Sequence, residues 1–266
     1  MNGPRMLSAV VQATVLFSLC LAGAGCGSAP DLKTAELFQN AETAFREAQS
    51  EEDFIRVATR YDQILSSGFV SGAVLYNQGN AWMRAGQPGR AIACWRAAQR
   101  YRPRDPYLTA NLQSALSSCG SAAMIQPDTG MAGYVLFWQN WLSETEKFLL
   151  TTVLLAAVCL CSTFAPWVLR RRLANRLTLA LTAGFLLSAA SAAWDWHRFD
   201  RINHGVVAVE SAMVRKGNSE SYESAFTKPV TEGTEFRVLD RRSDWLQVEF
   251  SGIGTGWLPS WSVVTY

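Results

Sequence analysis

The chain has 266 residues, of which 49% are hydrophobic and 17% are charged, and its formal net charge at pH 7 is +2. The length permits two small domains, but the hydrophobic residues are concentrated in a few stretches, which excludes a single soluble globule. The near balance of charge, without a basic face, gives no support to nucleic-acid binding.

The first residues have the pattern of a secretory signal. Arg5 precedes an apolar run from Met6 to Leu21, and small residues follow it up to Cys26. We interpret residues 1–25 as a signal peptide that exports the chain. Three outcomes stay open: lipidation of Cys26, ordinary cleavage after Ala24, or an uncleaved anchor. All three place the residues that follow outside.

A helical module is predicted for residues 34–118, which are helical in period and rich in Ala, Glu, Gln and Arg. Within it, residues 72–105 have the spacing of a tetratricopeptide repeat, carried by Leu75, Gly79, Trp82, Ala91, Trp95, Ala98 and Pro103. Small residues let the two helices of the repeat cross closely, and the tryptophans fill the space around that crossing. A degenerate repeat precedes this unit by one period, and a single capping helix from about Pro106 to Ser117 follows it.

Repeat solenoids of this kind bind extended peptides along their inner helices. Asn77, Asn80 and Arg84 lie at positions i, i+3 and i+7, about half a turn from the apolar stripe, and Asn111 stands one period after Asn77. We predict that these four residues bind a partner, with Asn77 and Asn111 paired on successive inner helices to hold a peptide backbone. A solvated polar face is the alternative.

A linker and interfacial segment is predicted for residues 119–147. Its aromatic residues recur at near-helical spacing next to the membrane, and we interpret them as an interfacial belt rather than a cofactor pocket; they are Tyr134, Phe137, Trp138 and Trp141. Ser143 and Glu146 have the spacing of a capping box, which predicts that a spanning helix starts there.

Two apolar stretches, residues 148–169 and 177–194, approach the length of about 20 residues that a membrane-spanning helix needs. The four arginines of the loop between them, residues 170–176, are expected to stay cytoplasmic. With an exported N-terminus, this hairpin leaves the helical module and the tail on the periplasmic side of a bacterial inner membrane. The alternative is a pair of helices buried in a soluble domain.

The tail, residues 204–266, changes to a period of two and predicts short strands that close a small barrel. Glu232-Gly233-Thr234, Asp244-Trp245, Gly256-Trp257 and Val263-Val264 resemble the bacterial Src-homology-3-like (SH3-like) family. We consider a ligand-binding surface made by Trp245, Trp257 and Trp261, with core filling as the alternative for the first two.

The pattern offers no chemistry for an enzyme. The two histidines, His197 and His204, fall in one juxtamembrane stretch without a cysteine cluster, so neither a catalytic set nor a zinc site is predicted. We expect no catalytic residue, metal or cofactor. A disulfide between Cys94 and Cys119 stays open, because sequence cannot place their α-carbons.

The predicted fold class is therefore multi-domain: a helical tetratricopeptide module, a two-helix transmembrane hairpin and a small all-β barrel. This order of parts, with the run Tyr76-Asn77-Gln78-Gly79-Asn80-Ala81, resembles the BatE-type proteins of aerotolerance operons. The resemblance implies a scaffold with membrane partners that carry von Willebrand factor A domains and with a MoxR-type ATPase, in a cell-envelope stress or assembly role. The alternative is peptidoglycan binding or sensing by the tail.

Overall fold

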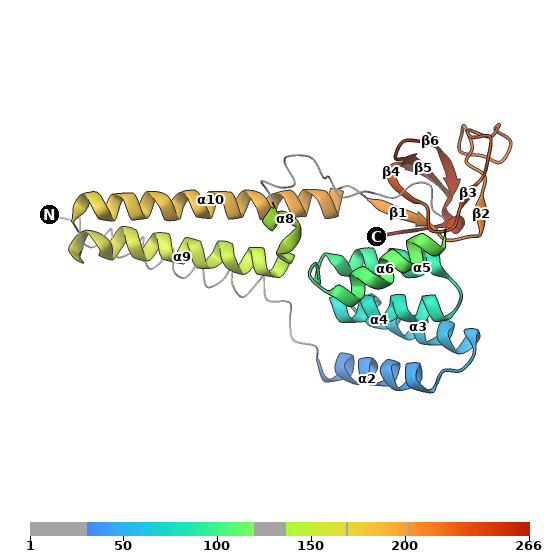
Figure 1. Ribbon diagram of the computed structural model, residues 1–266, viewed down its shortest axis with the longest axis horizontal. Coiled ribbons are helices and arrows are strands. Elements are labelled where there is room, and N and C mark those ends of the chain that lie inside the picture. Colours follow the sequence, from blue (N-terminus) through green and yellow to red (C-terminus); the bar gives the residue numbers. More distant parts are fainter. Residues whose placement is uncertain (1–30, 120–136, 169, 202) are drawn as a thin grey trace. The chain divides into compact units, whose positions relative to one another are not determined.

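A computed structural model describes residues 31–119, 137–168, 170–201 and 203–266 of the protein (Figure 1). These residues belong to two units that are considered separately below. One unit joins residues 30–141 with residues 200–266, and the other contains residues 142–199. Helices and a small antiparallel sheet make the first unit, and two long apolar helices make the second, so the architecture is mixed. The predicted signal peptide and Cys26 lie outside the described residues.

The helical region of the first unit contains α2 (Leu32–Glu47), α3 (Glu51–Ser66), α4 (Gly72–Arg84), α5 (Pro88–Gln99) and α6 (Pro106–Ser118), each packed on the next. Local sequence explains most of these boundaries. Ser50 and Asp53 form a capping box at the start of α3, and Ser71 and Asp105 cap α4 and α6 with their side chains. Prolines occupy the first position of α5 and α6, where no backbone donor is needed.

The close crossing predicted for α4 and α5 is present. A Cβ atom on Gly79 would lie 2.5 Å from Trp95 Nε1, so only glycine fits beneath this ring. Trp95 is buried, and its indole nitrogen donates a hydrogen bond to the carbonyl oxygen of Tyr76 at 3.2 Å. The small and large residues of the pattern therefore meet as the sequence requires.

The C-terminal sheet has the strand order β6-β5-β4-β1-β7, with all neighbours antiparallel. Its strands are β1 (His204–Val207), β4 (Glu235–Arg242), β5 (Trp245–Phe250), β6 (Gly254–Pro259) and β7 (Val263–Thr265); β2 (Ser211–Ala212) and β3 (Val230–Thr231) form a separate pair. Alternate residues of β5 are buried, as a half-buried strand requires. Gly233 has φ +78° in the turn before β4, a conformation that favours glycine.

The helical region and the sheet share one packed interior. Figure 1 shows α5 beside the sheet, where it contacts β1 and β7. Val206 of β1 belongs to the hydrophobic core of the helices, and a Cβ atom on Gly233 would lie 2.8 Å from Cys119 Sγ and 3.1 Å from Ile92 Cδ1. These close approaches make residues 31–119 and 203–266 one folded body rather than two tethered domains.

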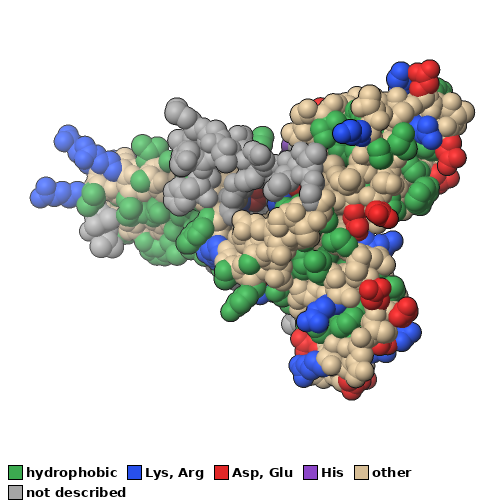
Figure 2. Space-filling view, turned by 45° about the vertical axis from the view of Figure 1, so that its right-hand side comes forward, with side chains coloured by type: hydrophobic (Ala, Val, Ile, Leu, Met, Phe, Trp, Pro, Cys, Tyr) green, Lys and Arg blue, Asp and Glu red, His purple; other side chains and the backbone are tan. Residues whose placement is uncertain are grey.

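The second unit contains α9 (Glu144–Val168) and all but the last two residues of α10 (Arg171–Arg201). Segments Glu144–Trp167 and Arg171–His197 are long and apolar enough to cross a membrane. They expose large apolar side chains such as Leu179, which is 72% exposed, whereas helices in the core of a soluble domain would bury them. In Figure 2, the visible hairpin surface is largely hydrophobic, with Lys and Arg side chains at its far end.

The capping box predicted at the start of the first apolar helix is confirmed. Ser143 N donates to Glu146 Oε2 at 2.8 Å, and Glu146 N donates to Ser143 Oγ at 3.3 Å. The loop predicted over residues 170–176 is wrong, because α10 already begins at Arg171. Arginine, leucine and alanine are good helix formers, so a run of charge marks the end of an apolar stretch without ending a helix.

Candidate interaction face

Helices α4 and α6 position the four residues predicted to bind a partner. Asn77, Asn80 and Arg84 lie on α4, and Asn111 lies on α6. The three asparagines are half-buried, whereas Arg84 is exposed. They do not form one cluster, and the contacts of each residue define its part in the site.

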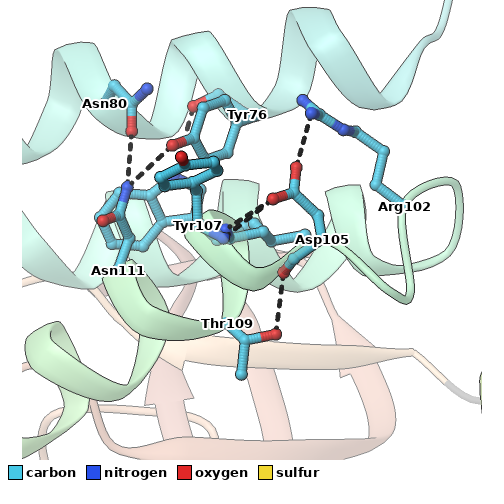
Figure 3. Close-up of polar contacts among 9 residues, drawn as sticks. Tyr76, Asn80, Arg102, Asp105, Tyr107, Thr109 and Asn111 are labelled. Carbon is cyan, nitrogen blue, oxygen red and sulfur yellow. Dashed lines mark hydrogen bonds and ion pairs between the residues drawn. The ribbon is translucent and has the colours of Figure 1, made fainter.

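Asn111 bonds to Asn80 rather than pairing with Asn77. Its Nδ2 donates to Asn80 Oδ1 at 3.2 Å and to the hydroxyl oxygen of Tyr76 at 3.1 Å (Figure 3). Tyr76 is held in turn by Arg102, whose guanidinium carbon lies 5.1 Å from the ring centroid, and Arg102 forms an ion pair with Asp105 at 2.5 Å. The result is a polar network that connects α4, α6 and the turn before α6.

The side of α4 that carries Asn77 borders a pocket of about 120 Å³. Asn77 and Asn80 form one wall, and α2 and α3 supply the others, through Glu42, Phe45, Arg46 and Tyr61. Glu42 and Arg46 form an ion pair at 3.8 Å, so a positive and a negative charge both border the space. The pocket therefore combines aromatic surface, two amides and a charge pair.

Tyr61, which α3 contributes to the pocket lining, is buried. Burial raises the pKa of its phenol to about 12, although the hydrogen bond with Asn77 acts in the opposite direction and the charge of Glu42 adds to the rise. The phenol is neutral at physiological pH and can take part in hydrogen bonds as donor and acceptor. The pocket thus offers hydrogen bonds from neutral groups, beside the Glu42–Arg46 pair.

Arg84 stands apart from the pocket and from the asparagine network. Its guanidinium carbon lies 5.9 Å from the ring centroid of Phe54 on α3. Asn77 and Asn80 are thus the two predicted residues that line the pocket, and Asn80 and Asn111 are the two that bond to each other.

Sequence reasoning missed Tyr76 and the residues contributed by α2. Tyr76 directly precedes Asn77 in the sequence, but its hydrogen bond with Asn111 depends on how far α6 is shifted along α4. Phe45 and Tyr61 stand one period of 34 residues before Gly79 and Trp95, which is a weak signal for their presence in a pocket. Neither signal indicates which side chain faces a ligand.

A buried polar group lies beneath the face. Gln78 donates to Asp62 Oδ1 at 2.5 Å and to the carbonyl oxygen of Ala58 at 3.5 Å, and it accepts a hydrogen bond from Cys94 Sγ at 3.3 Å. Burial raises the pKa of the Cys94 thiol to about 12. Cys94 and Cys119 are both free thiols in the structure.

The tryptophans of the sheet do not form a common surface. Trp257 is buried at 7% exposure, with the guanidinium carbon of Arg242 5.4 Å from its ring centroid. The prediction that Trp257 belongs to a ligand-binding surface is therefore wrong. Gly256, Trp257 and Leu258 of β6 are all buried, and Leu258 rather than Trp257 belongs to the core cluster of the sheet. Trp245 is half-buried, and Trp261 is 69% exposed.

Within residues 31–119, 137–168, 170–201 and 203–266, no group of three His, Cys, Asp or Glu residues could hold a metal ion. Of the aromatic belt, Phe137, Trp138 and Trp141 lie on the short helix α8 (Phe137–Trp141), and Tyr134 lies outside the described residues.

No protein-family model matches the chain, and no curated protein or solved structure is significantly similar to it.

Proposed function

We propose that this protein is a membrane-anchored scaffold of the bacterial cell envelope, whose helical region binds an extended segment of a partner protein. The observation that carries the proposal is the pocket bordered by Asn77 and Asn80, together with the hydrogen-bonded amides of Asn80 and Asn111. Amides on a rigid helical surface are suited to a peptide backbone, because each offers both a donor and an acceptor.

The asparagine bond determines which atoms face a ligand. It uses Nδ2 of Asn111 and Oδ1 of Asn80. The opposite ends, Oδ1 of Asn111 and Nδ2 of Asn80, are the acceptor and donor that we assign to the peptide. The pocket of about 120 Å³ is of a size for one side chain of that peptide rather than for a cofactor.

The buried ion pair between Arg96 and Glu235 supports a shared side of the membrane for the two parts of the first unit. These residues come before and after the two apolar helices, and they can meet only if the chain crosses the membrane an even number of times. The arginines at the junction of α9 and the start of α10 favour the cytoplasm, so we place the folded body on the periplasmic side of the inner membrane.

The partner class rests on the resemblance of the parts and their order to BatE-type proteins. Membrane proteins with von Willebrand factor A domains, working with a MoxR-type ATPase, are the partners that the resemblance implies. In this interpretation the helices are a tetratricopeptide module and the sheet is an SH3-like barrel, and the protein assembles other proteins without catalysis of its own.

One observation favours a second candidate, peptidoglycan binding by the sheet. Trp261 is 69% exposed, and an exposed tryptophan is suited to stack on a sugar ring. Cell-wall pull-down with the full chain tests this candidate, with Trp261→Ala as the variant. Loss of cell-wall recovery in the variant would favour the sheet as the functional end.

Crosslinking in intact membranes tests the scaffold. A photoreactive residue at position 46, where the exposed Arg46 borders the pocket, should capture a defined partner protein, and the same probe at the exposed Ser251 of the sheet region should not. Asn111→Leu, combined with the probe at position 46, should reduce capture because the amide network is lost. Equal capture from positions 46 and 251 would contradict the proposal.

A further inference from the structure

We propose that the pocket between α2, α3 and α4 takes a basic side chain, lysine or arginine, of the bound peptide. The pocket is lined by Glu42, Phe45, Arg46, Tyr61, Asn77 and Asn80, all of which belong to the first unit. The inference rests on the peptide binding proposed above and names the class of side chain that the pocket selects.

Aromatic rings form the apolar part of the pocket, and neighbouring helices hold them in place. Phe45 of α2 packs edge-on against Phe54 of α3, with the ring centroids 5.4 Å apart. Tyr61 of α3 packs in the same way against Phe38 of α2, at 6.1 Å. The methylene groups of a lysine or arginine side chain can cover such rings while the charged end reaches a polar group. The pocket is therefore suited to a long side chain with a polar end.

Glu42 carries the less exposed of the two charges at the pocket. Its side chain is 38% exposed, whereas that of Arg46 is 78% exposed. A charge that is less exposed to water is screened less and acts more strongly on a ligand. The negative charge of Glu42 also acts within the lining, because it contributes to the raised pKa of the Tyr61 phenol. A cation in the pocket is therefore favoured over an anion.

The ion pair with Arg46 leaves the carboxylate of Glu42 able to bind a ligand. The nitrogen and oxygen atoms are 3.8 Å apart, which is longer than a hydrogen bond. A pair of this kind between successive turns of an exposed helix contributes little to stability. No other described residue forms an ion pair with Glu42. A basic side chain of the peptide can therefore replace Arg46, whose exposed side chain can turn into the solvent.

Neutral oxygen atoms complete the surroundings of the cation. The phenol oxygen of Tyr61 and the amide oxygen of Asn77 can both accept hydrogen bonds. Ammonium and guanidinium groups carry donors and no acceptor, so they match a carboxylate beside neutral oxygen atoms. An acidic side chain would instead meet the like charge of Glu42, which opposes binding.

Peptide selection on the full chain in detergent tests the side-chain class. The purified protein selects from a library of random peptides displayed on phage, and the enriched peptides are sequenced. They should share a lysine or arginine at one position. Glu42→Lys should replace this preference by one for aspartate or glutamate, because the substitution reverses the charge of the lining.

A synthetic peptide from the wild-type selection then gives dissociation constants by fluorescence anisotropy. Glu42→Gln should weaken binding roughly 3- to 10-fold, because the partner of the basic side chain loses its charge. Arg46→Gln should strengthen binding about twofold, because the competing cation is removed. Partial unfolding cannot produce opposite effects at two neighbouring positions of one helix. Norleucine in place of the basic residue of the peptide should abolish the difference between the wild type and Glu42→Gln.

Glu36→Gln is the matched control. It removes the same charge from an exposed position of α2 outside the pocket and should leave the dissociation constant at the wild-type value. Equal losses in Glu36→Gln and Glu42→Gln would overturn the inference, as would weaker binding by Arg46→Gln. Enriched peptides without a shared basic residue would overturn it while supporting peptide binding itself. A selection that enriches no peptide would contradict both the inference and the peptide binding on which it rests.

Discussion

Arg96 of α5 and Glu235 of β4 form a two-contact ion pair, from Nε to Oε1 at 2.6 Å and from Nη2 to Oε2 at 2.9 Å. The Glu235 side chain is fully buried, and that of Arg96 is 17% exposed. Burial alone would lower the pKa of Arg96, but the hydrogen bond to Glu235 and its charge raise the pKa above its ordinary value. The pair therefore joins the helical region to the sheet, with the guanidinium of Arg96 charged.

Glu235→Gln should lower the free energy of unfolding by about 3–5 kcal/mol, because it leaves the Arg96 charge without its partner in a mostly buried site. Replacing both residues by methionine should restore much of the loss. Denaturant unfolding of the full chain in detergent measures these changes. The control is Arg237→Gln, which breaks an ion pair with Glu249 that is 41–49% exposed and should cost no more than about 1 kcal/mol. Similar losses at the two pairs would contradict this account.

Glu232, which bonds to Gly89 of α5, should make the free energy of unfolding depend on pH. Burial raises the pKa of its carboxyl group, the hydrogen bond from Gly89 N at 2.9 Å acts in the opposite direction, and the charge of Glu210 adds to the rise. A raised pKa means that the folded protein binds the proton more tightly than the unfolded chain. This contribution to stability is complete below the ordinary value of 4.5 and is lost as the pH rises through the folded pKa.

Glu232→Gln should remove that contribution while keeping an acceptor for Gly89 N. The free energy of unfolding of the variant, relative to the wild type, should therefore increase as the pH rises from 4 to 7. Thermal unfolding at several pH values measures the difference. A difference that is constant over this range would show that Glu232 does not titrate differently in the two states.

Gly79→Ala should destabilise the helical region by about 1–3 kcal/mol, because the added methyl group would overlap the indole of Trp95. Trp95→Phe in the same chain removes the nitrogen nearest to that methyl group. The double variant should therefore cost less than the sum of the two single changes. Additive losses, measured by denaturant unfolding, would indicate that the two residues do not compete for space.

Cys94 should resist alkylation in the folded protein at pH 7.5, because the reactive thiolate is scarce for a thiol with a pKa of about 12. Burial raises the pKa of Cys119 too, and both cysteines are half-buried. Cys119 lies at the end of α6, whereas the thiol of Cys94 donates a hydrogen bond to Gln78 inside the helical region, so Cys119 should react sooner. Mass spectrometry of maleimide-treated protein, before and after denaturation, measures both rates. Cys119→Ser is the control, and rapid native labelling of Cys94 would contradict the expectation.

Much of the fold could be predicted because its signals are local. The match of Gly79 with Trp95, the capping box of Ser143 and Glu146, and the alternation of β5 each depend on residues close in sequence or on a fixed period. The loop predicted over residues 170–176 was wrong because helix propensity is also a local property. The helix propensity of arginine is close to that of alanine, so the positive charge at Arg171 does not prevent a helix.

The candidate site was less predictable, because its contacts depend on how helices are offset. A period of 34 residues aligned Asn111 with Asn77, but the shift of α6 along α4 brings it to Asn80 and Tyr76. The ion pair of Arg96 and Glu235 joins residues 139 positions apart, and no periodicity connects them. Such pairs follow from packing of the whole body.

The first unit is discontinuous, which has a consequence for biosynthesis. During synthesis α5 is made before the residue that bonds its first turn, Glu232, and before the partner of Arg96. In the proposed topology, with α9 and α10 in the membrane, both acidic residues reach α5 only after the hairpin has been made and the tail has followed. A chain that stalls at the hairpin would therefore display a first turn of α5 without the bond from Gly89 N to Glu232 and an Arg96 without Glu235.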